Sequence, residues 1–181
     1  MEIKGRKSLV LGAGRSGIAS ATFLAERGAV VALHDRNDIE NWSDAARSLK
    51  ESHNVGLISG ELPSWLLDQI DLVVISPGVP TNTIPARYVD RKDGEVIGEV
   101  ELAYRFMKGR IVGITGSNGK TTTTTLIGEL LRNAGIETQV GGNIGTPLLS
   151  LAGSSTDATW TVVELSSFQL ETIVNFHPNI T

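Results

Sequence analysis

The sequence contains no cysteine, which excludes disulfide bonds and thiolate metal sites and agrees with a cytoplasmic location. It has no apolar run near the roughly 18 residues of a membrane span, and no signal-peptide pattern opens the chain. Lysine and arginine form no cluster and the formal net charge is −4, so we expect neither nucleic acid nor a membrane as a partner. The three histidines are scattered and no G-x-S-x-G motif occurs, which leaves a zinc site and a hydrolase triad without support.

Short apolar runs alternate with segments of helical pattern, which predicts an α/β fold with parallel sheets. The first half is expected to form a Rossmann-like sheet, with strands at 8–11, 29–33, 55–58, 72–75 and 95–97 and helices at 15–27 and 42–51. One face of the first helix would carry Ile18, Ala21, Thr22 and Ala25. A helix at 99–108 would lead to a second series, with strands at 110–114, 137–140 and 159–163 and a helix at 120–133.

Each series contains a strand, a glycine-rich loop and a helix in that order, which implies two nucleotide-type sites. We therefore place a domain boundary near Gly98, between a Rossmann-like domain (1–98) and the first part of a P-loop domain (99–181). Residues 178–181 resemble the start of a further strand, so the second sheet would end with an unpaired edge. On this interpretation the chain is a fragment.

The second glycine loop reads Gly116-Ser117-Asn118-Gly119-Lys120-Thr121 and opens the helix at 120–133. Glycines let backbone N–H groups close around phosphate oxygens, and a helix N-terminus adds a favourable partial charge. Lys120 would reach the β- and γ-phosphates of a nucleotide triphosphate, and the Thr121 hydroxyl would ligate Mg²⁺. The spacing is shorter than G-x-x-x-x-G-K-[ST], and a plain glycine turn before a helix is the alternative.

The first glycine loop reads Gly12-Ala13-Gly14-Arg15-Ser16-Gly17, and Asp35 follows the second strand. This fits the G-x-G-x-x-G fingerprint with an acid about 20 residues further on, and the geometry serves NAD or any other nucleotide diphosphate. Tight packing of a strand against a helix is the alternative. Ser76-Pro77-Gly78 follows another strand, where open α/β sheets place ligands, although a plain turn has the same sequence.

Two further segments suggest polar groups beside the P-loop. The glycines of Gly141-Gly142-Asn143-Ile144-Gly145 permit close backbone approach to a ligand, and Asn143 supplies a donor and an acceptor. Glu164 ends an apolar strand, where P-loop proteins place an acid that helps to hold Mg²⁺. The alternative for residues 141–145 is a simple loop, and the alternative for Glu164 is a solvated carboxylate. The presence of Lys120 and Thr121 favours the metal interpretation for Glu164.

Together these segments resemble the Mur ligases of bacterial peptidoglycan synthesis. The resemblance rests on residues 116–121, 141–145 and Glu164-Leu-Ser-Ser-Phe-Gln-Leu-Glu171, and the motifs at 12–17, 35 and 76–78 fall where that family's uridine-nucleotide domain has its own. It covers essentially the whole chain, with five motifs in order when Asp35 is counted with the loop at 12–17. It also implies that the first glycine loop binds a UDP-sugar and not NAD.

The resemblance implies an enzyme that phosphorylates the carboxylate of UDP-N-acetylmuramoyl-L-alanine with ATP and Mg²⁺, after which the nitrogen of D-glutamate attacks the acyl phosphate. The substrate-binding residues would be Gly14, Arg15, Ser16, Asp35, Arg36, Ser76, Gly78, Asn143 and Ser166. The ATP-binding residues would be Gly116, Ser117, Asn118, Gly119, Lys120, Thr121, Thr122 and Thr123. Thr121 and Glu164 would hold the metal; Lys120, Asn143 and Glu164 would act in catalysis, in a monomeric protein.

The family's metal-binding histidine, its carbamylated lysine and its D-glutamate domain would lie beyond Thr181, so we expect the chain alone to lack ligase activity. Arg36 directly follows Asp35, whereas other members have one more residue between the acid and the arginine, which leaves the uracil contact of Arg36 open. Two other functions are weighed against the ligase. A nicotinamide-dependent oxidoreductase would use residues 12–17 and leave the P-loop unexplained, and a non-catalytic P-loop module would require a partner for which no sequence feature is evident.

Overall fold

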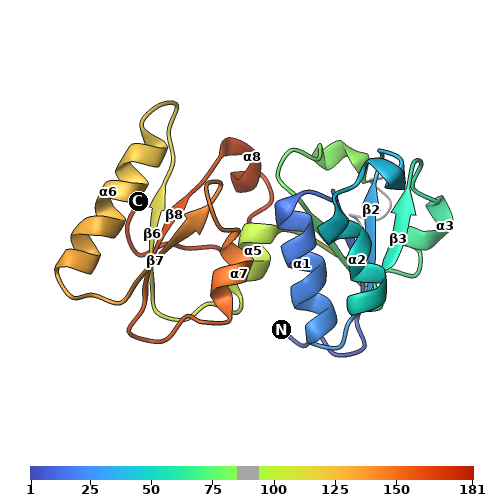
Figure 1. Ribbon diagram of the computed structural model, residues 1–181, viewed down its shortest axis with the longest axis horizontal. Helices are drawn as coiled ribbons and strands as arrows, with labels where there is room; N and C mark the ends of the chain where they lie inside the picture. Colours follow the sequence, from blue (N-terminus) through green and yellow to red (C-terminus); the bar gives the residue numbers. More distant parts are fainter. Residues whose placement is uncertain (85–93) are drawn as a thin grey trace. The chain divides into compact units, whose positions relative to one another are not determined.

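A computed structural model describes residues 1–84 and 94–181 of the chain. These residues form two compact units, an N-terminal unit (Met1–Glu99) and a C-terminal unit (Val100–Thr181). Both are built from parallel strands and helices, so the predicted α/β class is confirmed (Figure 1). None of the helices described has the length and apolarity that a membrane crossing requires.

The N-terminal unit contains one five-stranded parallel sheet in the order β3-β2-β1-β4-β5. Its strands are β1 (Lys7–Leu11), β2 (Val30–Asp35), β3 (Gly56–Ser59), β4 (Leu72–Ile75) and β5 (Glu95–Gly98). Its helices are α1 (Arg15–Glu26), α2 (Asp44–Ser52) and α3 (Ser64–Leu67), with 3₁₀ turns at Ile39–Asn41 and Thr81–Thr83. From β1 the chain first adds β2 and β3 on one side and then adds β4 and β5 on the other, so the strand order reverses between β1 and β4. A ligand crevice is expected at this point in such sheets.

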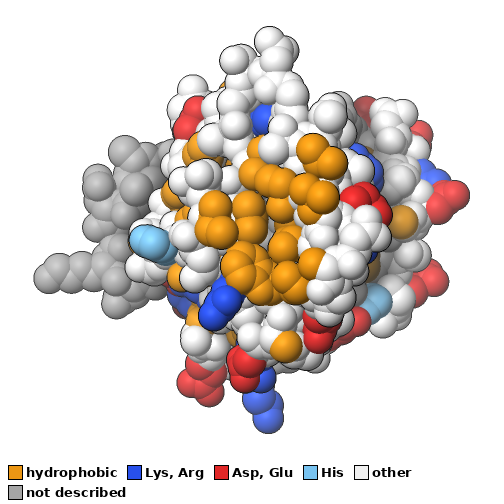
Figure 2. Space-filling model, turned by 90° about the vertical axis from the view of Figure 1, so that its left-hand side faces the viewer, with side chains coloured by type: hydrophobic (Ala, Val, Ile, Leu, Met, Phe, Trp, Pro, Cys, Tyr) orange, Lys and Arg blue, Asp and Glu red, His pale blue; other side chains and the backbone are white. Residues whose placement is uncertain are grey.

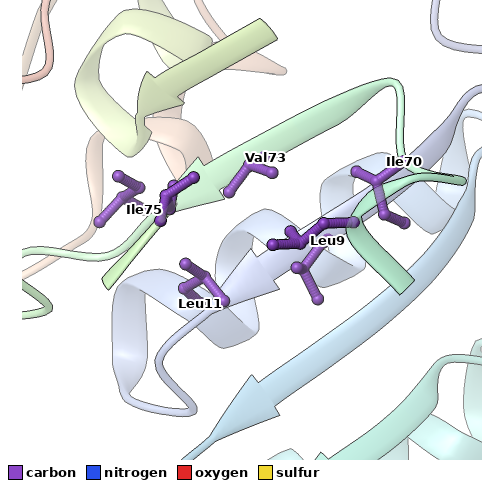
Figure 3. Close-up of a cluster of buried hydrophobic side chains, with 7 residues drawn as sticks. Leu9, Leu11, Ile70, Val73 and Ile75 are labelled. Carbon is purple, nitrogen blue, oxygen red and sulfur yellow. The ribbon is translucent and has the colours of Figure 1, made fainter. Parts of the chain in front are cut away.

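The core of this unit follows from the register of β1 against β4. Leu9 pairs with Val73 and Leu11 pairs with Ile75, so the four apolar side chains share one face of the sheet. Figure 3 shows them together with Ile70, and all five are almost fully buried. Every residue of β4 is buried, as is typical of a central parallel strand that is covered on both faces.

Helix α1 turns a different face to the core from the one that periodicity predicts. Of the predicted set only Ala21 is buried, while Ile18, Thr22 and Ala25 are half-buried. The helix instead buries Gly17, Ser20, Ala21, Phe23 and Leu24. A Cβ atom on Gly17 would overlap the carbonyl oxygen of Gly12, so the helix approaches the loop after β1 through its smallest residues. The close approach of Gly17 to the loop therefore adds to the burial of Phe23 and Leu24 in setting the orientation of α1.

The C-terminal unit begins within α5 (Glu99–Tyr104), which ends four residues before the predicted end of this helix. Its parallel sheet has the order β6-β8-β7. The remaining elements are β6 (Arg110–Ile114), α6 (Lys120–Asn133), β7 (Thr138–Gly142), α7 (Leu148–Ala152), β8 (Trp160–Glu164) and α8 (Ser167–Leu170). Ile180 forms a parallel bridge with Val112, which agrees with the predicted start of a further strand at 178–181.

Helix α6 packs against β7 and β8 but leaves part of its apolar surface uncovered. Leu126 and Leu130, one helical turn apart, are 56% and 59% exposed. Figure 2 shows hydrophobic side chains gathered on the side of the molecule on which α6 lies. The sequence pattern did not predict the three helices α3, α7 and α8, because each is only four or five residues long.

Candidate functional site

The P-loop of the C-terminal unit runs from the end of β6 to the first turn of α6. Gly116 has φ 138° and Gly119 has φ 78°, conformations that side chains rarely adopt, and a Cβ at either position would meet no atom within 4 Å. The Lys120 ammonium group folds back over the loop and donates to the carbonyl oxygens of Gly116 (2.7 Å) and Ser117 (3.4 Å). The loop therefore has space beside its glycine backbone and a lysine ammonium group in contact with it, an arrangement that suits an anionic phosphate.

Glu164 lies at the centre of a polar cluster beside this loop. Thr121 Oγ1 donates to Glu164 Oε2 at 2.8 Å, and Asn143 Nδ2 donates to Glu164 Oε1 at 3.0 Å. The glutamate is only 2% exposed, so the alternative of a solvated carboxylate is wrong. Since β8 lies between β6 and β7, the end of β8 meets both neighbouring loops; Glu164 is in register with Ile114 on one side and with Gly142 on the other.

The glycines that precede Asn143 allow its close approach to β8. Gly142 has φ 106°, and a Cβ there would overlap the carbonyl oxygen of Glu164. The backbone N–H of Asn143 donates to that same oxygen at 2.8 Å. Asn143 is thus bound to Glu164 through both its backbone and its side chain. This arrangement orients the carboxylate toward Thr121.

Ser166 follows at the start of α8 and is held by a capping box. Its hydroxyl lies 3.3 Å from the N–H of Gln169 and 3.2 Å from Gln169 Oε1, and Gln169 Oε1 also accepts from the Ser166 N–H. The preceding N–H, that of Leu165, donates to Ile114 O at 2.8 Å and so fixes this turn beside the start of the P-loop. Sequence reasoning missed Gln169, although S-x-x-Q is a recognisable capping signal.

The predicted N-terminal site residues collect where β1, β2 and β4 end. Asp35 links two of these loops, because its Oδ2 accepts from the Ala13 N–H (2.9 Å) and its Oδ1 from the Asn37 N–H (3.0 Å). Ser76 is buried after β4, and its hydroxyl donates to Gly12 O at 3.3 Å. The glycine loop is therefore held from both sides, by an acid after β2 and by a hydroxyl after β4.

Three cavities surround these loops. The first, of about 210 Å³, is lined by Leu11, Gly12, His34, Asp35, Arg36, Gly78, Val79, Pro80 and Thr83. The second, of about 380 Å³, is lined by Ala13, Gly14, Arg15, Ile18, Asp35, Asn37, Asn41, Trp42 and Ser43. The third, of about 540 Å³, is lined by His34, Arg36, Gly60, Glu61, Leu62 and Thr83. Asp35 thus lines both the first and the second cavity, and Arg36 lines the first and the third.

Trp42 is the main residue of this region that sequence reasoning misplaced. The predicted helix at 42–51 starts two residues too early, because α2 begins at Asp44 with Ser43 as its N-cap. Trp42 instead precedes the helix, lines the second cavity and donates through Nε1 to Asn37 O at 2.8 Å. Ser16 is half-buried in the first turn of α1, on the same glycine loop, and lines none of the three cavities.

Among residues 1–84 and 94–181, no three histidine, cysteine or acidic side chains converge in a way that could hold a metal ion. The groups suited to a hard cation in the C-terminal unit are the hydroxyl of Thr121 and the carboxylate of Glu164, which lie in contact. A magnesium site here would need further oxygen ligands from a bound phosphate or from water, as is usual for this ion.

Comparison with known proteins finds two family models, one within each unit. Residues 6–98 match the family model "Mur ligase MurD-like, N-terminal domain", and residues 114–180 match "Mur ligase middle domain". The UDP-N-acetylmuramoylalanine–D-glutamate ligase of Koribacter versatilis is 48% identical over 188 residues, and that of Acidobacterium capsulatum is 49% identical over 181 residues. Each alignment covers 99% of this chain, which spans only 40% and 39% of these two relatives.

A solved structure supports the fold. The UDP-N-acetylmuramate:L-alanyl-gamma-D-glutamyl-meso-diaminopimelate ligase of Neisseria meningitides aligns with a TM-score of 0.51 at 16% identity, over 87% of this chain and 52% of that one. The resemblance that the motifs suggested is confirmed, because the two family models follow each other in the expected order and one of them alone covers residues 6–98. The chain therefore belongs to the Mur ligase family, as a homologue of the N-terminal domain and part of the middle domain of UDP-N-acetylmuramoylalanine–D-glutamate ligases.

Proposed function

We propose that the chain supplies the UDP-sugar site and part of the ATP site of a ligase that joins D-glutamate to UDP-N-acetylmuramoyl-L-alanine, in the cytoplasm, for peptidoglycan synthesis. The observation that carries this proposal is the contact of Thr121 and Asn143 with the buried carboxylate of Glu164, directly beside the P-loop. A glycine turn without a ligand has no need of a buried acid there. The relatives at 46–49% identity bear the name of this ligase.

The residues of the C-terminal unit fit a magnesium-bound ATP, which is the energy source used in this family. The N–H groups at the start of α6, such as that of Thr122, would face the phosphates, whereas the N–H of Thr123 donates to Gly119 O and Thr123 would contribute through its hydroxyl. Lys120 would exchange its contacts with Gly116 O and Ser117 O for phosphate oxygens. Thr121 and Glu164 would hold Mg²⁺, which when bound neutralises charge on the phosphates. Asn143 would keep Glu164 oriented through its side-chain contact.

The residues of the N-terminal unit fit a nucleotide diphosphate carrying a sugar. Arg15 and the N-terminus of α1 would attract the diphosphate, and Ser16 would add a hydroxyl donor. The cavity beside Asp35 and Arg36, which has the apolar walls Val79 and Pro80, would take the flat base. Because Asp35 already accepts two backbone N–H groups, it would act mainly by holding the glycine loop in shape.

In the proposed reaction, an oxygen of the alanyl carboxylate attacks the γ-phosphorus of ATP, ADP leaves, and an acyl phosphate forms. The amine of D-glutamate then attacks the acyl carbon, phosphate leaves, and an amide bond forms with loss of a proton from nitrogen. The protein would bind and orient the two substrates and neutralise charge on the phosphates, and would form no covalent bond to them itself. Gly14, Ser76, Gly78 and Ser166 would line the sugar and the alanyl arm.

Isothermal titration of the chain with UDP-N-acetylmuramoyl-L-alanine, and separately with NADH, tests the N-terminal site. We expect a saturable signal with the UDP-sugar and none with NADH; tight binding of NADH without a UDP-sugar signal would contradict the proposal. A fluorescent ATP analogue, mant-ATP, titrated with and without Mg²⁺, tests the C-terminal site. Binding that requires Mg²⁺ is the expected result, and absence of binding under both conditions would contradict the ATP assignment.

A further inference from the structure

The most heavily hydrogen-bonded carboxylate among the described residues belongs to Glu101 on α5, away from the P-loop cluster. Its side chain is completely buried. One oxygen, Oε2, accepts from three successive backbone N–H groups, those of Val174 (2.9 Å), Asn175 (2.8 Å) and Phe176 (2.9 Å). The other, Oε1, accepts from Arg105 Nε at 2.9 Å.

Moving an ionised carboxylate out of water costs several kcal/mol unless hydrogen-bond partners compensate. A carboxylate buried in this way therefore needs partners for both of its oxygens. Here the compensation comes mainly from the backbone of a segment more than 70 residues away in the sequence. Tyr104, on the same helix, packs edge-on against the Phe176 ring with centroids 5.4 Å apart. Helix α5 thus fixes both the backbone and a side chain of residues 174–176.

The residues that follow this anchor extend the sheet beside the P-loop strand. Asn179 N donates to Ile111 O at 2.8 Å, and Ile111 N donates back to Asn179 Oδ1 at 2.8 Å. Gly113 N donates to Ile180 O at 2.8 Å. Strand β6, which leads straight into the P-loop, is therefore held by β8 on one edge and by residues 179–180 on the other.

We propose that Glu101 is a positioning residue for the nucleotide site: it fixes residues 174–176, and through them residues 179–180, so that β6 and its P-loop are held in place. Its influence on the loop passes through the backbone of the added strand, and Glu101 itself touches no proposed ligand. The nucleotide part of this inference rests on the proposed function; the structural part does not.

The test compares two variants with a control. Glu101→Gln keeps the shape of the side chain but removes the charge and one acceptor oxygen, while Asn179→Ala breaks only the contact with Ile111 N. Glu129→Gln is the control, because Glu129 is a half-exposed carboxylate that pairs with Arg132 on α6 and lies outside the proposed site. Hydrogen exchange of a peptide spanning residues 110–121 and the affinity for mant-ATP are measured on all four proteins at a temperature where each stays folded.

We expect exchange in the 110–121 peptide to rise about tenfold in Glu101→Gln and in Asn179→Ala, with a loss of mant-ATP affinity of similar size, and no change in the control. A folded Glu101→Gln protein with wild-type exchange in this peptide overturns the inference. Should Glu101→Gln fail to fold, Asn179→Ala decides: unchanged exchange overturns the inference, and faster local exchange supports it. Failure of the wild-type chain to bind mant-ATP would count against the proposed function. The hydrogen-exchange measurement would still test whether Glu101 holds β6 and the P-loop in place.

Discussion

The hydroxyl of Thr121 donates to Glu164 Oε2 at 2.8 Å and so joins two residues that are 43 positions apart in the sequence. Thr121 stands in the first turn of α6, directly after the P-loop lysine, and Glu164 ends the central strand β8. The contact brings together the only hydroxyl and the only carboxylate that we assign to the metal site. It gives the proposed magnesium site a geometry that single substitutions can probe.

Replacing Thr121 by valine should weaken magnesium-dependent binding of mant-ATP by about tenfold, which corresponds to ~1.4 kcal/mol, because valine keeps the side-chain shape but removes the oxygen. Thr121→Ser retains the hydroxyl and should stay within about twofold of the wild type. Titrations in Mg²⁺ and in EDTA measure both effects. If the valine variant bound like the serine variant in Mg²⁺, the role of Thr121 at the metal would be wrong.

Replacing Lys120 by alanine should remove most of the affinity for ATP while leaving binding of the UDP-sugar nearly intact, because the two proposed sites belong to different units. Loss of a phosphate-contacting cation is expected to cost about 2 kcal/mol, or roughly thirtyfold. Lys50→Ala, which removes an exposed lysine from α2, is the matched control. Equal loss of both ligands in Lys120→Ala would contradict the separation of the sites.

Two glycines of the first loop should respond very differently to alanine. A Cβ at Gly17 would overlap Gly12 O, so Gly17→Ala should lower the free energy of unfolding by about 3 kcal/mol. Gly14 has no atom within 4 Å of a Cβ and has φ −78°, so Gly14→Ala should change stability by less than about 1 kcal/mol. Urea denaturation measures both. A stable Gly17→Ala protein would show that α1 can move away from the loop.

Glu101 should make stability depend on pH on the acid side. Burial by itself raises the pKa of Glu101, but the hydrogen bonds from Val174, Arg105, Asn175 and Phe176 outweigh it, and the pKa lies below its ordinary value of 4.5. The unfolded chain therefore takes up this proton at a higher pH than the folded chain. The stabilisation is present above about pH 4.5 and is lost as the pH falls through the lower folded value.

At pH 7 the Glu101→Gln variant should thus be less stable than the wild type by about 3 kcal/mol, and the difference should narrow as the pH falls below 4.5. Denaturation curves between pH 7 and the acid limit of folding, with Glu129→Gln as the control, measure this difference. If the difference in free energy of unfolding stayed constant with pH, the charge of Glu101 would not contribute to stability.

The strand, loop and helix around the P-loop were predictable because each has a strong local signal. An apolar run predicts β6, glycines mark the loop, and β6 and α6 begin and end where the sequence pattern places them. The position of Glu164 beside the P-loop was predictable for a related reason, since parallel strands end at one edge of a sheet and an acid at a strand end meets the neighbouring loops. For α1 the predicted face was wrong, because the helix turns the small residues Gly17, Ser20 and Ala21 to the core to approach the loop after β1, which hydropathy does not indicate.

What the sequence by itself determined, then, is the alternation of strands and helices, the family, and the set of residues at the ends of the strands. Only the tertiary structure decided which of these residues meet: the two partners of Glu164, the two loops that Asp35 joins, and the three amides around Glu101. The physical reason is that propensity and periodicity act over a few neighbouring residues. The contacts of Glu164 with Asn143 and Thr121, and of Glu101 with the Phe176 N–H, join groups 21, 43 and 75 residues apart, whose positions follow from strand order and register.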